Sequence, residues 1–194
     1  MKSRILPRFF YARNTVHVAR DLLGKRLARI KGRMRMLGRI VEVEAYRGID
    51  DPASHAFRGL TIRNQPMFGQ PGHAYVYFTY GNHYCLNVTT EQVGIPGAVL
   101  IRALEPLEGL NAMRRLRPKV SDLKLTNGPG KLTKAFAIDK SLNEIDMTKQ
   151  GPLYILESGP ESFEIVATQR VGIRDGKDRM WRFYVSGNAY ISRP

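Results

Sequence analysis

Two glutamates lie two residues apart in a chain that is otherwise strongly basic. Glu42 and Glu44 occur in the run "RIVEVEAY", and Tyr46 follows at the same spacing. In an extended strand, residues two apart project to one face, so these three side chains would share a face. A face that carries two carboxylates and a phenol is costly to bury without partners. The run therefore predicts either a solvated surface or a site for acid–base chemistry.

A histidine follows these carboxylates in a long irregular segment. His55 lies within residues 47–72, which are rich in Gly, Pro, Asp and Asn. Irregular segments of this length in compact domains are usually functional or disordered. A lone loop histidine is more often a surface or structural residue. Because His55 follows Glu44 and Tyr46 closely in the chain, the alternative is a pocket residue whose side chain hydrogen-bonds a bound base or a phosphate.

The run "HAYVYFTYGNHYCLNVTT" combines tyrosines with a tight turn. Gly81-Asn82 between two alternating segments predicts a β-hairpin. On a strand, Tyr75 and Tyr77 would share one face, opposite Val76, and aromatic strands most often pack in a core or on a sheet. On a basic protein, a ring such as Tyr80 beside the turn could also wedge into a base stack, while neighbouring rings hold the unstacked base. Asn87, on the return strand, needs a partner if buried, and a base edge would serve.

The charge of the chain points to a polyanion. Lys and Arg number 31 against 17 Asp and Glu, a net charge of +14. This balance favours nucleic acid or an anionic membrane surface, against the alternative of a merely soluble basic protein. The basic residues are spread along the chain, which favours a folded basic surface over a disordered arm. No run approaches the roughly 20 apolar residues of a membrane span. We therefore expect a nucleic acid as the partner and no membrane association.

Several familiar chemistries are excluded by spacing. The run "NGPGKLT" is not a phosphate-binding P-loop, because the pattern needs Gly and Ser/Thr where this chain has Leu125 and Leu132. The start of that expected helix could still contact a backbone phosphate, and a plain helix cap is the equal alternative. The four histidines lack metal-site spacing, and the single Cys85 can form no internal disulfide. We expect an enzyme without metal or cofactor.

The local patterns predict a mixed order of strands and helices in one domain, residues 1–194. Strands are expected at residues 25–30, 33–46, 73–80, 83–90, 97–104, 153–158, 163–171 and 181–187, and helices at 15–23, 105–117 and 127–138. Several of the strands are joined by short turns. We therefore predict an α+β fold around a mostly antiparallel sheet.

Together these features suit chemistry on a nucleotide that has been flipped out of a duplex. One ionised glutamate could activate water for attack at a sugar carbon, and its charge would stabilise an oxocarbenium-like transition state. Glycoside hydrolysis also needs a general acid for the leaving group. An alkylated purine already carries positive charge, so it depends less on a general acid.

At this point the chain resembles a known family. The runs "RIVEVEAYRGIDDPASHAFRG", "RNQPMF", "GHAYVYFTYGNHYCLNV", "VLIRALEPLEG", "NGPGKLTKAFAI" and "WRFYVSG" resemble, in order and spacing, the alkyladenine (3-methyladenine) DNA glycosylases of the mammalian alkylpurine type. The resemblance extends from about residue 5 to residue 194. It implies a single domain around a curved antiparallel sheet, with a β-hairpin that inserts into the DNA minor groove. It also implies hydrolysis of the N-glycosidic bond without metal, cofactor or lyase step, on 3-methyladenine, 7-methylguanine, hypoxanthine and ethenoadenine.

The resemblance assigns roles residue by residue. It implies Glu44 as the general base, Tyr46, His55 and Tyr77 as contacts of the flipped base, Tyr80 as the intercalating wedge, Asn87 as the residue that crowds the amine of normal guanine, and Arg102 as a DNA or pocket contact. Spacing alone leaves Glu42 and Glu44 equal. The resemblance selects Glu44 and leaves Glu42 as a supporting carboxylate or an ion-pair partner of an arginine. The hairpin tip, Asn82-His83, departs from the more apolar tips of the animal enzymes.

Two alternatives remain at this stage: a non-catalytic DNA- or RNA-binding protein of the same fold, and an RNA-binding accessory domain. An intact Glu44 with aromatic neighbours argues against a pure binder. We expect a monomer with no obligate protein partner, in the cytoplasm or nucleoid, or in the nucleus of a eukaryote.

Overall fold

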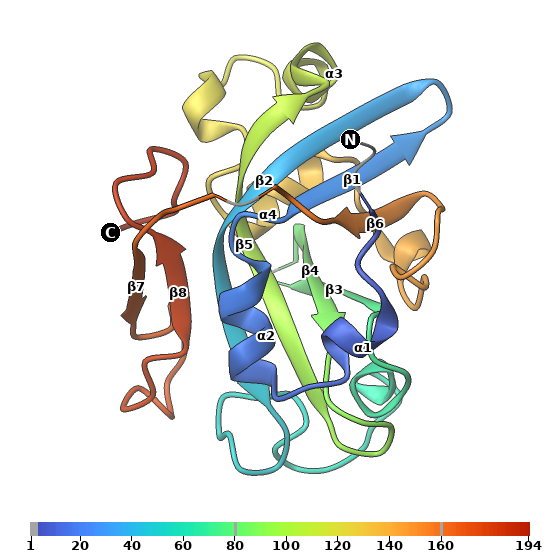
Figure 1. Ribbon diagram of the computed structural model, residues 1–194, viewed down its shortest axis with the longest axis vertical. Coiled ribbons are helices and arrows are strands. Elements are labelled where there is room, and N and C mark those ends of the chain that lie inside the picture. Colours follow the sequence, from blue (N-terminus) through green and yellow to red (C-terminus); the bar gives the residue numbers. More distant parts are fainter. Residues whose placement is uncertain (1–3, 80, 160) are drawn as a thin grey trace.

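The computed structural model describes residues 4–79, 81–159 and 161–194 of the chain (Figure 1). Within these residues the strands form one eight-stranded sheet whose pairings are all antiparallel. The main path through the sheet runs β3-β4-β5-β2-β1-β6, and β8 joins β2 to β7. The sheet is curled, with short helices packed against it (Figure 1). The predicted single-domain α+β fold with an antiparallel sheet is confirmed.

The N-terminal elements follow the sequence signals closely. Helix α1 (Arg8–Tyr11) was not predicted, whereas α2 (Thr15–Leu22) was. The Asn14 side chain caps α2 by accepting from Val16 N at 3.0 Å. Gly24, just beyond the helix, has φ +80°, a left-handed conformation that favours glycine.

Strand β2, which carries Glu42 and Glu44, pairs along its length with three strands. It spans Met34–Arg47 and pairs with β1 (Arg26–Lys31) through Arg39. Beyond that point β8 (Arg182–Val185) takes the place of β1 along residues 42–44, while β5 (Gly97–Glu108) pairs on the other edge. The β2–β5 register shifts on both sides of Glu42. Such bulges re-aim side chains, and this one lies beside the two carboxylates.

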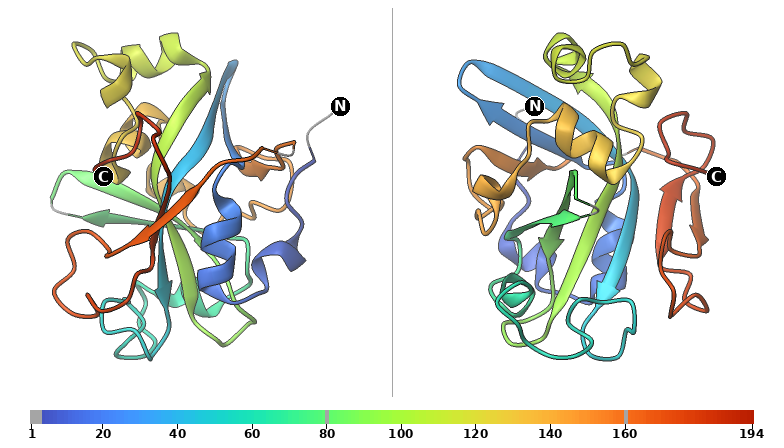
Figure 2. Two further views of the ribbon diagram at one scale, coloured as in Figure 1. Left: turned by 60° about the vertical axis from the view of Figure 1, so that its left-hand side comes forward. Right: turned by 180° about the vertical axis from the view of Figure 1, so that it is seen from behind.

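The predicted β-hairpin is confirmed as β3 (Ala74–Thr79) and β4 (His83–Thr89), and Gly81 in the turn has φ +70°. Figure 2 shows the hairpin reaching out from the body of the sheet. Val76 joins the core, whereas Tyr75 and Tyr77 face the opposite side, as the alternation predicted. Tyr80, the predicted wedge, lies outside the described residues.

One predicted helix boundary is wrong. Residues 105–108 continue β5, and the helix that was predicted from residue 105 is α3 (Leu110–Leu116). Pro106 pairs in register with Gly38 of the long β2, at a register shift that tolerates a residue with no N–H. Gly109, with φ +81°, then makes the turn into the helix. This boundary depends on the pairing of residues 105–108 with the distant strand β2, which the local sequence does not show.

The remaining elements are short. They are the 3₁₀ turns Gln65–Phe68, Asp122–Lys124 and Lys140–Leu142, helix α4 (Pro129–Ala135), and strands β6 (Leu153–Leu156) and β7 (Ile165–Thr168). The last three predicted strands are confirmed in place, but each is shorter than predicted.

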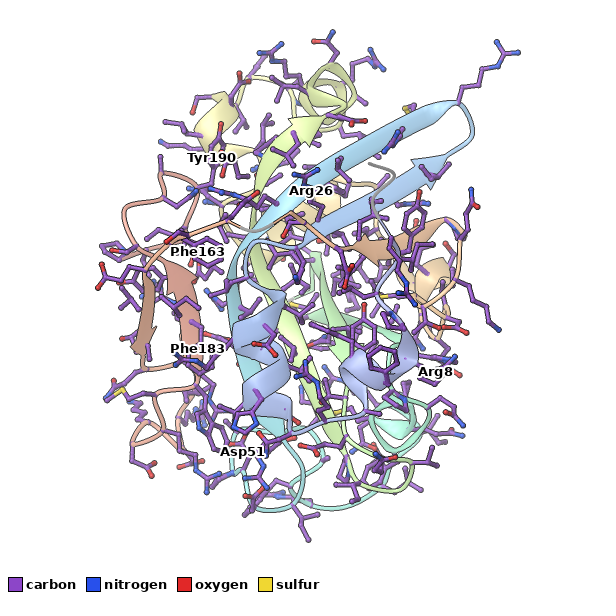
Figure 3. The ribbon with its side chains drawn as sticks, in the orientation of Figure 1. Arg8, Arg26, Asp51, Phe163, Phe183 and Tyr190 are labelled. Atoms are coloured by element: carbon purple, nitrogen blue, oxygen red, sulfur yellow. The ribbon has the colours of Figure 1, made fainter. Side chains whose placement is uncertain are left out.

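The core lies between the sheet and helices α2, α3 and α4. It contains Val41, Val43 and Ala45 of β2, together with Phe183 of β8, which Figure 3 labels. The other face of β2 at residues 42–46 is therefore left for the polar residues. In the described part of the chain, no helix is long and apolar enough to cross a membrane.

Candidate active site

Both glutamates of "EVEAY" are completely buried on the polar face of β2. The predicted sharing of a face by Glu42, Glu44 and Tyr46 is confirmed by a hydrogen bond from the Tyr46 hydroxyl to Glu44 Oε2 at 2.8 Å. Of the two alternatives that the sequence left, a solvated surface is therefore excluded.

Glu42 is held by four donors. Arg102 Nε and Arg182 Nε donate to its Oε1 at 2.9 and 2.8 Å. Ser192 donates twice, from its hydroxyl to Oε1 at 2.8 Å and from its backbone N–H to Oε2 at 2.5 Å. Burial alone would raise the pKa of Glu42, but Arg102, Ser192 and Arg182 outweigh it, and the pKa is lowered. Three of these four bonds converge on Oε1, and only the Ser192 N–H donates to Oε2.

Glu44 is held by three donors. The backbone N–H of Val171 donates to Oε1 at 2.6 Å, and the Tyr46 hydroxyl donates to Oε2. Arg102 Nη1 lies 3.2 Å from the same Oε2. Among the described residues, three of the four lone-pair positions of Glu44 are therefore used. Glu44 thus has a backbone N–H and a phenol among its partners, whereas Glu42 is held by two arginines and Ser192.

Arg102 bridges the two carboxylates. Its Nε donates to Glu42, its Nη1 faces Glu44 and its Nη2 donates to Ser192 Oγ at 3.2 Å. Burial would lower the pKa of Arg102, but the charges of Glu44 and Glu42 outweigh it and raise that pKa. Arg102 is therefore a fixed cation between two fixed anions.

A cavity of about 200 Å³ opens beside this network. Its lining includes Tyr46, His55, Tyr77, Asn87 and Arg102, so the structure brings together every predicted pocket residue. Glu44 does not line the cavity itself, but Tyr46, Arg102 and Val171, which hold its carboxylate, all do. Drug-sized ligand sites measure about 300–1,000 Å³ and one water occupies about 30 Å³. The cavity therefore suits one flat heterocycle.

Rings form the wall of the cavity near its opening. His55 and Tyr77 meet edge to face with centroids 4.6 Å apart, and Tyr75 lies 5.1 Å from Tyr77. The His55 Nδ1 and the Tyr75 hydroxyl share a hydrogen bond of 2.9 Å. The guanidinium of Arg63 lies 5.1 Å from the centre of the Tyr77 ring. Burial and the charge of Arg63 lower the pKa of His55 to about 4, so His55 is neutral at pH 7.

The comparisons with known proteins agree with this geometry. Residues 9–189 match the family model of methylpurine-DNA glycosylase. A protein of Carboxydothermus hydrogenoformans named "Putative 3-methyladenine DNA glycosylase" is 52% identical over 190 residues, 97% of this chain and 99% of that protein. Proteins of the same name from Methanocella arvoryzae and Clostridium acetobutylicum are 51% and 49% identical; the matches cover 97% and 96% of this chain, and 96% and 97% of those proteins. The chain belongs to the methylpurine-DNA glycosylase family. The predicted resemblance is thereby confirmed, and the chain is a DNA glycosylase, a hydrolase of DNA repair.

In this member of the family, Asn87 and Cys85 form the wall contributed by β4. Asn87 is buried, and its Nδ2 donates to the backbone oxygen of Tyr75 at 3.0 Å. Cys85 is buried as well, and burial raises the pKa of its thiol. Cys85 is therefore a small buried side chain in this wall.

Sequence reasoning missed a buried stack behind Tyr46. The guanidinium of Arg170 lies 4.8 Å from the Tyr46 ring centre and 5.3 Å from that of Trp181. Its Nη1 and Nη2 donate to both oxygens of Asp51, at 2.5 and 2.7 Å, and Nη1 also donates to the backbone oxygen of Ala45 at 2.9 Å. Asp51 lies in the loop after β2, as Figure 3 shows. The stack ties this loop to the segment that carries Val171. In the sequence, Asp51 and Arg170 lie far apart, and nothing near either residue marks the two as partners.

The run "NGPGKLT" starts α4 beside the hairpin. Lys131 folds back on the helix start and donates to Asn127 Oδ1 at 2.9 Å. A Cβ at Gly130 would lie 2.7 Å from Cγ of His83, so the hairpin packs closely on this turn. The backbone-phosphate contact stays a prediction. Within the residues that the structure describes, no group of three His, Cys, Asp or Glu side chains is placed to hold a metal ion.

Proposed function

We propose that this glycosylase flips damaged purines out of duplex DNA and hydrolyses their N-glycosidic bond with a water that Glu44 activates, leaving an abasic site. The substrates are 3-methyladenine, 7-methylguanine, hypoxanthine and ethenoadenine. The observation that carries the proposal is Glu44, fully buried behind an aromatic cavity of about 200 Å³, with one lone-pair position that no described residue uses.

The geometry supports Glu44 over Glu42 as the base. Of the groups that hold Glu42, only Arg102 lines the cavity, whereas Arg182 and Ser192 do not. Glu44 is contacted by three groups that also line the cavity. A water that donates to Glu44 is therefore adjacent to the site of the flipped nucleotide, which is the first requirement of a general base.

The proposed reaction is a hydrolysis. The water oxygen bonds to C1′ of the sugar, the C1′–N bond breaks, and its electron pair leaves with the purine. Glu44 takes a proton from the water, and its negative charge stabilises the oxocarbenium-like sugar. A cationic alkylpurine leaves as a neutral base without protonation, whereas neutral hypoxanthine leaves as an anion that takes up one proton from solvent, and Glu44 later returns its proton to solvent. No lyase step follows, because the nucleophile is water and not an amine of the protein.

The aromatic wall supports the recognition step. Tyr46 lies on the Glu44 side of the cavity, and Tyr77 and His55 lie on the wall near the opening. Base–aromatic stacking contributes about 1–3 kcal/mol per base. A neutral His55 can donate one hydrogen bond without adding a positive charge beside a cationic base. Asn87 fills the β4 side, where it would crowd the amine of an undamaged guanine.

The hairpin and the basic surface supply the remaining parts of the proposal. Tyr80 would take the place of the flipped base in the stack, and phosphate contacts would dominate the affinity for duplex DNA. Affinity should therefore fall steeply with salt. We also propose that the protein acts as a monomer without a protein partner, in the compartment that holds the genome.

Single-turnover release of hypoxanthine from a duplex with one deoxyinosine tests the proposal. The native protein should release the base, and Glu44→Gln should bind the duplex equally well but react at least about 10³-fold more slowly. Glu157→Gln, on the exposed surface, is the matched control and should react like the native protein. If the native protein binds DNA but releases neither hypoxanthine nor a methylated purine, the chain is a binding protein of this fold and the proposal is wrong.

A further inference from the structure

A segment far along the chain contacts the buried carboxylates. Ser192 lies beyond β8, yet its backbone N–H and its hydroxyl both donate to Glu42. The same hydroxyl oxygen accepts from Arg102 Nη2 at 3.2 Å. Arg182 joins this segment to the site from the other side, since it donates both to Glu42 and to the backbone oxygen of Arg193. Residues 192–193 are thus part of one network with Arg102.

The network leaves Arg102 a single orientation. A guanidinium is a rigid planar fork, so contacts at three nitrogens fix its plane and its rotation. Two of these contacts, at Nε and Nη2, go to Glu42 and Ser192, which do not line the cavity. The third nitrogen, Nη1, is thereby aimed at Glu44 Oε2, and Arg102 itself lines the cavity.

The charges of the network are balanced. Glu42 and Glu44 face Arg102 and Arg182, two anions and two cations, all with side chains at most 7% exposed. Without Glu42, Arg102 would have one anionic partner instead of two and could turn its whole fork toward Glu44. A bidentate pair would then occupy the lone pairs that the proposed reaction needs.

We propose that Glu42 and Ser192 are positioning residues that hold Arg102 to a single contact with Glu44, so that the segment at residues 192–193 sets the geometry of the reacting carboxylate. The inference rests on the proposed role of Glu44 and adds a function for the second glutamate and for a distant serine.

The first test is the pair Ser192→Ala and Ser192→Thr, since a neutral side chain with partial exposure can be changed without leaving a charge unpaired. Ser192→Ala should slow single-turnover hypoxanthine release about tenfold, with duplex affinity and melting temperature near native. Ser192→Thr restores the hydroxyl and should return the rate to within about threefold of native. An alanine variant as fast as the native protein would overturn the proposal.

The second test asks whether Ser192 acts through Arg102. In the Arg102→Gln background there is no guanidinium to position, so adding Ser192→Ala should cause no further loss of rate. A further loss of the same tenfold would show an independent, merely structural role and would overturn the proposal.

The third test compares two glutamates with the same substitution. Glu42→Gln should slow release about 100-fold while the duplex still binds. Glu105→Gln is the matched control, because Glu105 pairs with Arg39 and accepts from Asn188 in the same late segment but does not contact Arg102. It should react within about twofold of native. Equal losses in both variants would overturn the proposal, and if Glu42→Gln does not fold, the Ser192 pair decides. If the native protein releases no base at all, the proposed function fails instead.

Discussion

The inner end of the cavity and its wall are built on different principles. Behind the inner end, Glu44 and Arg102 lie on paired central strands, and every charge is buried and met by at least one opposite charge. In the wall, His55 meets the edge of Tyr77 and shares a hydrogen bond with the Tyr75 hydroxyl, and the Arg63 guanidinium lies over the Tyr77 ring. Under the proposed function, a fixed charge geometry would serve the chemistry, whereas a wall of rings would stack on bases whose edges differ. The contrast teaches that one cavity can combine an end built on charge with a wall built on packing.

The largest effect is expected where the inner network is broken. Arg102→Gln leaves two buried carboxylates facing a single arginine, so we expect a loss of about 3–5 kcal/mol in the free energy of unfolding at pH 7. Urea denaturation measures it. Arg39→Gln is the comparison, because Arg39 pairs with Glu105 and Glu161 at a 24%-exposed position and should lose about 1 kcal/mol or less. Similar losses in the two variants would contradict the distinction between a buried network and surface pairs.

A second prediction concerns the stack that joins the two regions. Asp51→Asn removes the charge partner of the fully buried Arg170, and we expect a loss of about 3 kcal/mol. Since Asp51 belongs to the loop that carries His55, the loop should also open more often. Limited trypsin digestion at the exposed Arg58 and Arg63 measures this opening.

Asp50→Asn is the neighbouring control. Asp50 is 49% exposed and lies 3.4 Å from Arg47 and 3.8 Å from Arg179, so its loss should be near zero and digestion should stay slow. Equally fast digestion of both variants would mean that the loop is not held by the Asp51–Arg170 pair.

The sequence predicted which side chains share a face at the inner end of the cavity better than it predicted the residues that hold them in place. Alternation placed Glu42, Glu44 and Tyr46 on one face of their strand, and Tyr75 and Tyr77 of the hairpin on the face opposite Val76, because a strand's period of two is a local property. The register shift beside Glu42, the Arg170 stack and the contact of Ser192 could not be predicted. Each joins residues more than 50 positions apart, and nothing local marks such partners. The boundary at Pro106 failed for the same reason, since only the length of β2 reveals its pairing.

A third prediction tests the wall. Tyr77→Ala removes the ring that packs on His55 and on the proposed base, so the affinity for a duplex with deoxyinosine should fall by about 1–3 kcal/mol. Tyr77→Phe keeps the ring and should bind nearly as the native protein. Fluorescence anisotropy with damaged and undamaged duplexes separates base recognition from general DNA affinity. If alanine weakens both duplexes equally, Tyr77 does not read the flipped base.

The smallest effect is expected in the wall of the cavity, where the positive charge of Arg63 acts on the pKa of His55. Burial, first, and the Arg63 charge, second, lower the pKa of His55 from 6.5 to about 4. A lowered histidine pKa means that the unfolded chain binds a proton more readily, so this group destabilises the fold as the pH falls from 6.5 toward 4. Arg63→Gln should raise the pKa of His55 part of the way, because burial remains, and should lessen that loss of stability. Titration of the His55 ring signals by NMR measures the shift directly, with Arg58→Gln as the control on the same loop. An unchanged His55 titration in Arg63→Gln would mean that burial alone keeps the imidazole neutral, and that the wall owes its neutrality to packing and not to charge.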